Sequence, residues 1–321
     1  MLMLTVGCGR GGQTVHHEEA APRALSPFDG QYPIQIVATT GPVADMLRSL
    51  GGQHVEVAGL MGPGVDPHLY RAVPSDIEKL TAADIIFYNG LHLEGRLADT
   101  LEQLGRRQPT FAVTHQLVES QDKRLRKPPD FEGYYDPHVW HDAQLWADCA
   151  KYVADVLSQF DPSHRDDYAK NLETYQAALH EADQYARSEL AKIPEQQRAL
   201  VTAHDAFGYF CTAYELTPMP LKGISTEEEV SISRMDEVID FLVERKVKAV
   251  FVETAVAPRI VKALIEPCQD RGHEVVIGGE LYADALGGPG SGAETTPGMI
   301  LANVDTIVSA LDGSAQQANA E

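Results

Sequence analysis

The sequence predicts an α/β protein of two lobes, each with a parallel β-sheet flanked by helices, joined by one long rigid helix. In both halves of the chain, short β-rich runs alternate with single helical patterns. Strands separated by single helices are typical of βαβ units, whose strands are parallel. Between the halves, one apolar stripe of helical spacing continues through residues 161–194. A chain of 321 residues is long enough to form two such lobes.

Residues 1–32 are predicted to hold a signal remnant, a lipid attachment site and a flexible tether. The first seven residues are apolar, and Leu4-Thr5-Val6-Gly7-Cys8 is similar to the lipobox in which a bacterial lipoprotein receives its lipid. An ordinary disordered N-terminus is the alternative. Residues 9–32 are rich in Gly, Pro, Glu and small residues without a hydrophobic period, which is typical of a linker.

The first lobe is predicted over residues 33–160. Pro42 occupies a first helical turn, and Ser75 with Glu78 three residues later has the spacing of a capping box. The patterns predict strands at 34–39, 55–60 and 85–88, and helices at 42–50, near 75–80 and at 93–104.

The linking helix is predicted over residues 161–194, because Asp161-Pro162 has the form of a cap and first turn and Pro194 ends the stripe. A stiff link of this kind predicts a small tilt of the lobes rather than wide closure. The second lobe is predicted over 195–312 and a frayed tail over 313–321. Its expected elements are strands at 200–203, 249–252 and 275–277, and helices at 206–214, 235–245, 260–268 and 299–311.

Composition narrows the function classes. The net charge of −21 repels phosphate backbones, so nucleic acid is an improbable partner. Beyond Cys8, the cysteines Cys149, Cys211 and Cys268 are widely spaced and contain no CxxC, which excludes a thiolate metal site. Buried free thiols are expected, although the sequence leaves a single disulfide open.

Two of the twelve histidines occur in the same local word. Asp66-Pro67-His68-Leu69-Tyr70 and Asp136-Pro137-His138-Val139-Trp140 each place Asp-Pro before the histidine and an aromatic residue two positions after it. Proline stiffens the loop that presents the imidazole, and the aspartate is suited to hold the ring tautomer. The repeated word predicts two metal ligands, with His141 as a conceivable extra one.

Two further ligands are expected at the ends of strands in the second lobe. His204 follows a predicted strand directly, and ligands of open α/β sheets collect beyond the carboxyl ends of strands. Either Glu280 or Asp284, in the loop after another strand, could supply a carboxylate. Three imidazoles and one carboxylate suit Zn²⁺, Mn²⁺ or Fe²⁺, and acidic neighbours such as Asp66, Asp136 and Asp205 would offset the charge.

The remaining histidines of the folded part need no special role. His92 and His115 lie beside the ends of predicted elements, where packing or a backbone hydrogen bond would explain them. Polar settings predict that four others face solvent, namely His54, His164, His180 and His273.

From about Ile36 to Leu311, the chain resembles the metal-binding receptors of ABC importers for manganese, zinc and iron. The landmarks are Thr40-Gly41-Pro42-Val43-Ala44-Asp45, both Asp-Pro-His words, Tyr88-Asn89-Gly90-Leu91-His92-Leu93-Glu94, Ala203-His204-Asp205-Ala206-Phe207-Gly208-Tyr209-Phe210 and Leu281-Tyr282-Ala283-Asp284-Ala285-Leu286-Gly287. The resemblance implies a metal site in the interlobe cleft, formed by His68, His138, His204 and Asp284.

The resemblance also implies one Zn²⁺ or Mn²⁺ per chain as cargo, no organic cofactor, and an ABC permease with its ATPase as partners. An extracytoplasmic monomer, held at the membrane through lipidated Cys8, is the expected form. The loop 119–135 lacks the histidines of zinc-specific relatives, and His204 stands where several manganese-specific relatives have Glu. The pattern is most similar to the branch that accepts both metals.

Two other functions remain open at this level. A zinc metallohydrolase could use the same three histidines and Asp284 if one coordination position stayed open to water, with Glu280 or Asp205 as base. A surface adhesin is a further possibility, as a secondary role.

Overall fold

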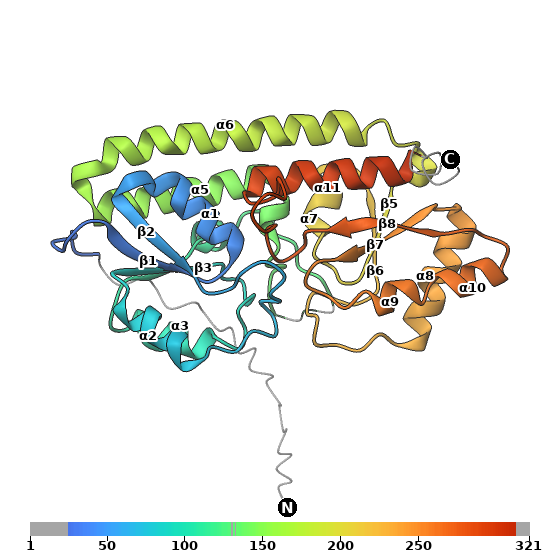
Figure 1. Ribbon diagram of the computed structural model, residues 1–321, viewed down its shortest axis with the longest axis horizontal. Coiled ribbons are helices and arrows are strands. Elements are labelled where there is room, and N and C mark those ends of the chain that lie inside the picture. The colour runs from blue at the N-terminus through green and yellow to red at the C-terminus, as the bar shows by residue number, and fades with distance from the viewer. Residues whose placement is uncertain (1–24, 130, 132, 313–321) are drawn as a thin grey trace, which may run out of the picture.

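Two α/β lobes lie side by side, and a long helix runs along the top of both (Figure 1). The computed structural model describes residues 25–129, 131 and 133–312. The predictions for Cys8, for most of the tether and for the tail 313–321 lie outside the described residues. Among the helices of those ranges, none combines the length and the apolar character needed to cross a membrane.

The first lobe is built on a four-stranded parallel sheet with the order β2-β1-β3-β4. Ile36 of the central strand pairs with Val57 on one side and Ile85 on the other. The strands are β1 (Ile34–Ala38), β2 (Val55–Gly59), β3 (Ile85–Tyr88) and β4 (Thr110–Ala112). The helices are α1 (Gly41–Gly51), α2 (Pro74–Ala82), α3 (Ala98–Gly105), α4 (His115–Glu119) and α5 (Ala143–Phe160).

The second lobe contains two parallel strand pairs, β5 with β6 and β7 with β8. The predicted parallel arrangement is therefore present in both lobes. The strands are β5 (Ala199–Thr202), β6 (Thr217–Pro220), β7 (Ala249–Glu253) and β8 (Val276–Leu281). The helices are α7 (Gly208–Ala213), α8 (Ile232–Arg245), α9 (Arg259–Lys262), α10 (Ile265–Asp270) and α11 (Thr296–Leu311).

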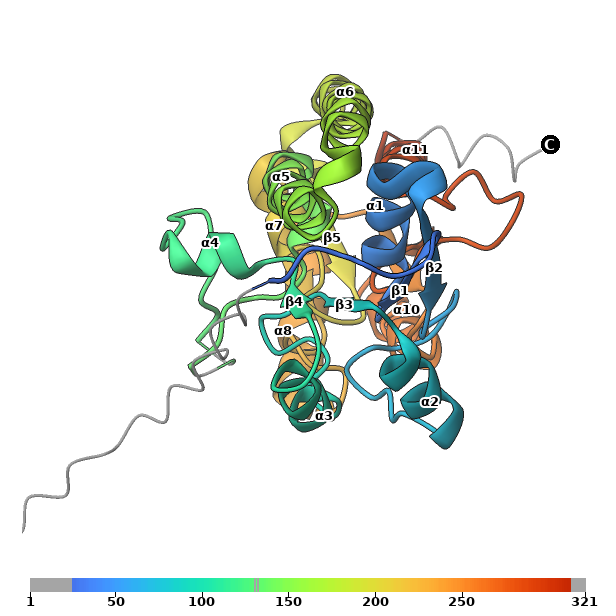
Figure 2. The same cartoon turned by 90° about the vertical axis from the view of Figure 1, so that its left-hand side faces the viewer.

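The linking helix α6 is regular over Arg165–Leu190, which at 1.5 Å per residue spans about 39 Å. A short 3₁₀ turn, Pro162–His164, precedes it. Helices α5, α11 and α1 pack against α6 (Figure 2). Most residues of the predicted stripe, among them Tyr175 and Leu190, are buried in that interface. The long connecting helix is thus confirmed, although its regular part is shorter than 161–194.

Several local predictions were wrong for identifiable reasons. Pro74 takes the first helical position of α2, so that Asp76 caps the helix by accepting the Val73 N–H at 3.0 Å, and the expected Ser75–Glu78 capping box is absent. The helix expected at 260–268 is split, because Pro267 has no N–H for the carbonyl four residues earlier.

Helix α3 begins later than predicted, since its first five expected residues form turns. Helix α11 begins three residues earlier than predicted, where the Thr295 hydroxyl caps its first turn. Four of these strands and helices had no predicted counterpart, namely β4, β6, α4 and α5.

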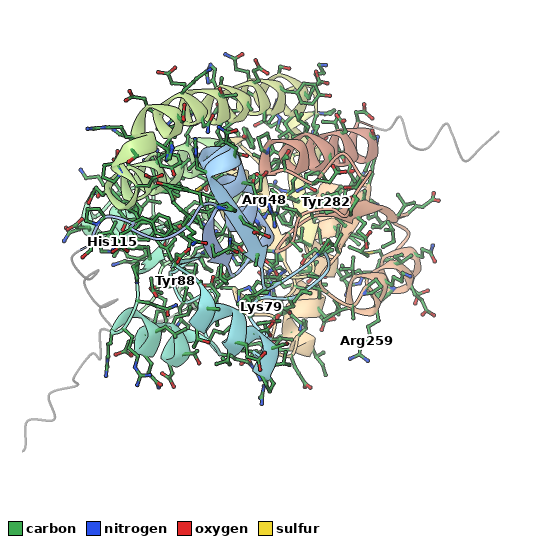
Figure 3. The ribbon with its side chains drawn as sticks, turned by 60° about the vertical axis from the view of Figure 1, so that its left-hand side comes forward. Arg48, Lys79, Tyr88, His115, Arg259 and Tyr282 are labelled. Carbon is green, nitrogen blue, oxygen red and sulfur yellow. The ribbon has the colours of Figure 1, made fainter. Side chains whose placement is uncertain are left out.

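The packing separates apolar and charged groups in the usual way. Cys149, Cys211 and Cys268 are free and buried, as expected from their spacing, and burial raises the pKa of the Cys149 thiol. Lys79 on α2 and Arg259 on α9 are exposed (Figure 3), whereas Asp45 on α1 and Asp76 on α2 are buried.

Candidate metal centre

Four buried side chains converge where the two lobes meet. His68 lies in the loop between β2 and α2, and His138 lies just before α5. His204 and Asp284 follow the carboxyl ends of β5 and β8 in the other lobe. One donor atom from each residue lies within 4.8 Å of the donor atoms of the other three. The structure therefore brings together all four of the residues singled out by the sequence.

The spacing of these atoms suits a small cation. The Nε2 atom of His138 lies 3.3 Å from His68 Nε2 and 3.3 Å from Asp284 Oδ1, and His204 Nε2 lies 3.3 Å from Asp284 Oδ2. Donors on a tetrahedron with bonds of about 2.0–2.1 Å are separated by about 3.3–3.4 Å. A fourth distance, from His68 Nε2 to Asp284 Oδ2, is longer at 4.0 Å.

The site also contains buried polar atoms that lack a hydrogen bond. Among residues 25–129, 131 and 133–312, nothing forms a hydrogen bond with His204 Nε2 or with either carboxylate oxygen of Asp284. His138 and His204 are fully buried, whereas His68 and Asp284 are only 6% and 2% exposed. Because an unsatisfied buried acceptor is costly, this cluster is suited to hold a bound cation.

The carboxylates of Asp136 and Glu253 orient two of the imidazoles by accepting hydrogen bonds from their Nδ1 atoms. Asp136 Oδ1 accepts the Nδ1–H of His138 at 2.8 Å and its backbone N–H at 3.0 Å. Glu253, the last residue of β7, accepts the Nδ1–H of His204 at 2.5 Å. In each case the bond places the proton on Nδ1 and leaves Nε2 facing the other three residues.

The aspartate of the first Asp-Pro-His word acts differently from the prediction. Asp66 accepts the backbone N–H of His68 at 2.9 Å rather than bonding to its ring. Its other oxygen accepts the Thr226 hydroxyl of the opposite lobe at 2.5 Å. Asp205 lies farther back, where it pairs with Arg126, and Arg126 also pairs with Asp136.

The electrostatic environment shifts the pKa values of the site residues in different directions. Burial lowers the pKa of His68 to about 3. Burial also opposes protonation of His138, but its hydrogen bond to Asp136 and the nearby Asp284 carboxylate outweigh this effect and raise the pKa to about 8. The neighbouring histidines, His204 first, hold the pKa of Asp284 well below its usual range despite burial. Asp284 is therefore an anion at neutral pH, as a carboxylate ligand must be.

Other candidates from the sequence do not join the cluster. Glu280 is exposed on β8, so the open choice between Glu280 and Asp284 falls to Asp284. His141 donates from Nε2 to the Ala283 carbonyl at 2.9 Å, so that this nitrogen is unavailable as a ligand atom. The ring of His92 stacks on Tyr134 with a centroid distance of 4.2 Å.

Two of the histidines expected to face solvent pack together instead. The rings of His54 and His164 stack with a centroid distance of 3.8 Å. His54 pairs with Asp167 at 2.9 Å, and His164 pairs with Asp161 at 2.7 Å. Half-buried His273 contacts the Val247 carbonyl at 2.8 Å, whereas His180 is exposed as predicted and His115 lies at the outer edge of the first lobe (Figure 3).

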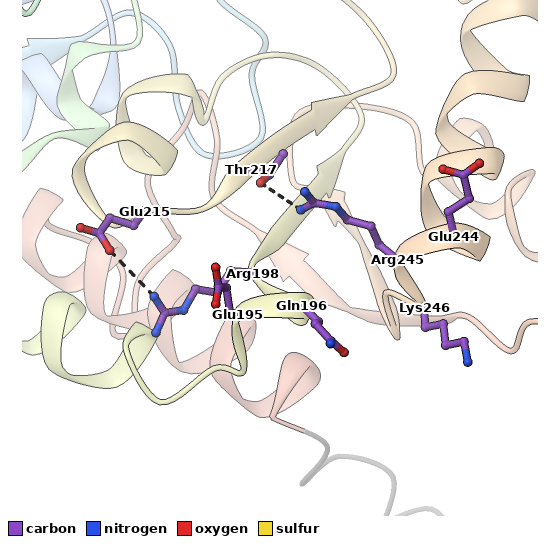
Figure 4. Close-up of a pocket in the computed structure, with 8 residues that line it drawn as sticks. All are labelled: Glu195, Gln196, Arg198, Glu215, Thr217, Glu244, Arg245 and Lys246. Atoms are coloured by element: carbon purple, nitrogen blue, oxygen red, sulfur yellow. Dashed lines mark hydrogen bonds and ion pairs between the residues drawn. The ribbon is translucent and has the colours of Figure 1, made fainter.

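A separate hollow of about 820 Å³ lies in the second lobe (Figure 4), and its lining includes none of the four site residues. Arg198 approaches Glu215 at 3.9 Å there, and Arg245 donates to the Thr217 hydroxyl at 3.3 Å. Its lining thus mixes both signs of charge and has no convergent set of ligand atoms. The residues that line it are Glu195, Gln196, Arg198, Glu215, Thr217, Glu244, Arg245 and Lys246.

The sequence reasoning did not identify Glu253. Glu253 directly follows the apolar run Ala249–Val252, whose sequence indicates only a strand. A carboxylate at the carboxyl end of a parallel strand, beside the strand that delivers His204, was the available signal.

Two α/β lobes bridged by a long helix, with three imidazoles and one carboxylate buried between them, define a solute receptor of the metal-importing class. A family model described as "Zinc-uptake complex component A periplasmic" matches residues 36–310. The chain belongs to this family.

Individual relatives agree with the family. The chain is 41% identical over 279 residues to the manganese-binding lipoprotein MntA of Bacillus subtilis, covering 87% of this chain and 90% of that protein. It is 41% identical over 276 residues to the zinc-binding protein TroA of Treponema pallidum, covering 86% and 88%. The solved structure of the periplasmic zinc-binding protein TroA superposes with a TM-score of 0.82 at 40% identity, covering 87% and 99%.

Proposed function

We propose that this protein captures a divalent transition-metal cation, Zn²⁺ or Mn²⁺, with His68, His138, His204 and Asp284, and delivers it to an ABC permease. The observation that carries the proposal is the convergence of three imidazole nitrogens and a carboxylate at a buried point between the lobes. Relatives named as manganese-binding and zinc-binding proteins support the choice of cargo. A further relative is named as an iron ABC transporter substrate-binding lipoprotein.

The wider setting follows from the same family. We place the protein outside the cytoplasm as a monomer, attached to the membrane through lipidated Cys8, with the permease and its ATPase as partners. Relatives named as substrate-binding lipoproteins of metal ABC transporters support this setting. The lobes are assigned to residues 33–160 and 195–312, with 161–194 as the link.

A catalytic role is not supported by the site. The family is described as a zinc-uptake component, and the four buried donor atoms would fill a tetrahedral set around one cation. A catalytic zinc needs a position open to water. We therefore propose a receptor rather than a hydrolase.

The direct test is the metal content of the purified protein. The chain is stripped with a chelator, dialysed against equimolar Mn²⁺ and Zn²⁺, and analysed by mass spectrometry. One zinc per chain would support the site without fixing the physiological cargo, because zinc is intrinsically favoured over manganese. Manganese retained against zinc would identify a manganese receptor.

Variants locate the bound ion. His68→Ala and His204→Ala are expected to lose stoichiometric metal, since each removes one of four ligands. His92→Ala is the matched control, because its ring stacks on Tyr134 outside the cluster. Absence of metal from the wild-type protein, or loss of metal only in the control, would contradict the proposal.

A further inference from the structure

One backbone carbonyl, immediately before Asp284, receives two side-chain donors from the opposite lobe. The indole Nε1–H of Trp140 donates to the Ala283 oxygen at 2.9 Å, and Nε2 of His141 donates to the same oxygen at 2.9 Å. A carbonyl oxygen has two lone pairs, so both bonds can form together. All three residues are at most 1% exposed.

The same short turn contacts the other ligand loops. The ring of His141 packs on Phe207, three residues after His204, with a centroid distance of 4.5 Å. The indole of Trp140 lies 5.2 Å from the ring of His138. Trp140 and His141 therefore connect His138 of the first lobe with the two ligand loops of the second.

The hydrogen bonds also define the form of His141. A nitrogen that donates to a carbonyl carries the proton, so the neutral ring has Nε2–H and an unprotonated Nδ1. That Nδ1 is buried, and it has no hydrogen-bond partner in the part of the chain that the structure describes. The unsatisfied Nδ1 costs free energy, and it accompanies the hydrogen bond from Nε2–H to Ala283. Apolar packing at this position would not carry that cost.

We infer that Trp140 and His141 are positioning residues that hold Asp284 against His138, through the Ala283 carbonyl, before the cation arrives. The inference rests on the proposed function. Because the carboxylate is already fixed, the cation does not have to order it on binding, and holding a site in its bound geometry strengthens binding. Separation of the lobes during release would break both bonds to Ala283 and withdraw Asp284 from the cation.

The test compares donors that reach Ala283 with a donor that does not. Trp140→Phe removes the indole N–H, and His141→Leu removes the imidazole donor. Trp146→Phe is the matched control, because Trp146 is equally buried but donates to the Tyr175 hydroxyl at 3.1 Å. His141→Gln is the conservative variant, since its amide N–H₂ can occupy the place of Nε2–H.

The measurement is the rate at which Zn²⁺-loaded protein releases its ion to an excess of a chromophoric chelator, followed by stopped flow. Loss of one neutral hydrogen bond predicts release about fivefold faster in Trp140→Phe and in His141→Leu. His141→Gln should stay near the wild-type rate. The melting temperature of each metal-free variant records any general loss of stability.

The outcomes separate the two proposals. Equal acceleration by Trp140→Phe and Trp146→Phe, or wild-type release from both Trp140→Phe and His141→Leu, would overturn the positioning role. If His141→Leu does not fold, the comparison of His141→Gln and Trp140→Phe with Trp146→Phe decides in the same way. Wild-type protein that holds no zinc would instead refute the metal site itself.

Discussion

Replacing Glu253 by Gln tests how far metal binding depends on a residue that never touches the cation. Glu253 Oε2 accepts the Nδ1–H of His204 at 2.5 Å, while Oε1 accepts the backbone N–H groups of Ala203 at 2.7 Å and His204 at 3.0 Å. The side chain is buried. It therefore fixes both the loop and the ring tautomer of His204.

A glutamine can satisfy only part of this arrangement. If its amide oxygen accepts the two backbone N–H groups, its N–H₂ group faces Nδ1 of His204. Nδ1 must then act as an acceptor, and the ring proton moves to Nε2, the atom that faces the cation. Changes to such supporting partners typically cost about 10- to 100-fold in metal affinity, or about 1.4–2.7 kcal/mol.

The affinity of Glu253→Gln for Zn²⁺ and Mn²⁺ is measured by competition with a chromophoric chelator, beside Glu280→Gln as the control. Glu280 is exposed on β8, so its replacement should leave the affinity unchanged. Melting of the metal-free proteins shows whether the variant folds. A folded Glu253→Gln protein with the affinity of Glu280→Gln would refute the argument that Glu253 sets the tautomer of His204.

Two further predictions concern stability. Although burial acts to raise the pKa of Asp161, hydrogen bonds from His164, Tyr168 and Tyr32 hold that pKa below its usual value. The ionised carboxylate therefore stabilises the fold above pH 4, and this stabilisation is lost as the pH falls through the folded-state pKa. Asp161→Asn should therefore lower the free energy of unfolding by about 2 kcal/mol at pH 7 in urea titrations, with a smaller difference at pH 3; an equal difference at both pH values would contradict this. In Gly208→Ala, the new methyl group would overlap the Arg126 guanidinium and separate it from buried Asp136. Because the displaced guanidinium ends a flexible side chain that is 24% exposed, thermal melting should show a loss of about 1 kcal/mol. Unchanged stability would contradict the tight contact.

The fold could be predicted where the signal was local. The alternation of strands and helices and the stripe of α6 are periodic patterns, and both are present in the structure. Helix α5 has similar periodicity, from Leu145 to Phe160, and was available to the same reasoning. Strand β6 was not, because two of its four residues are proline, and only its pairing with β5 defines it as a strand.

In the candidate site, too, some residues have a local sequence signal and others are defined only by tertiary contacts. His68 and His138 are recognisable from a word of a few residues, whereas the choice of Asp284 over Glu280 needed either the family resemblance or the coordinates. Supporting contacts such as Glu253 with His204 join residues 49 positions apart. Pairings of this kind are set by how β5 and β7 pack, and a single sequence carries no local record of that.

The positions of the interlobe contacts favour a small movement for metal exchange. At the centre of the molecule, buried Asp45 of α1 accepts the Thr296 N–H of α11 at 2.8 Å and the Tyr175 hydroxyl of α6 at 3.1 Å. A wide rotation would remove the Thr296 N–H from this buried carboxylate, which is costly. Exposed Glu227 pairs across the lobes with Arg96, and such a pair is cheap to break. Exchange should therefore open the exposed contacts first, while the helices around Asp45 stay together.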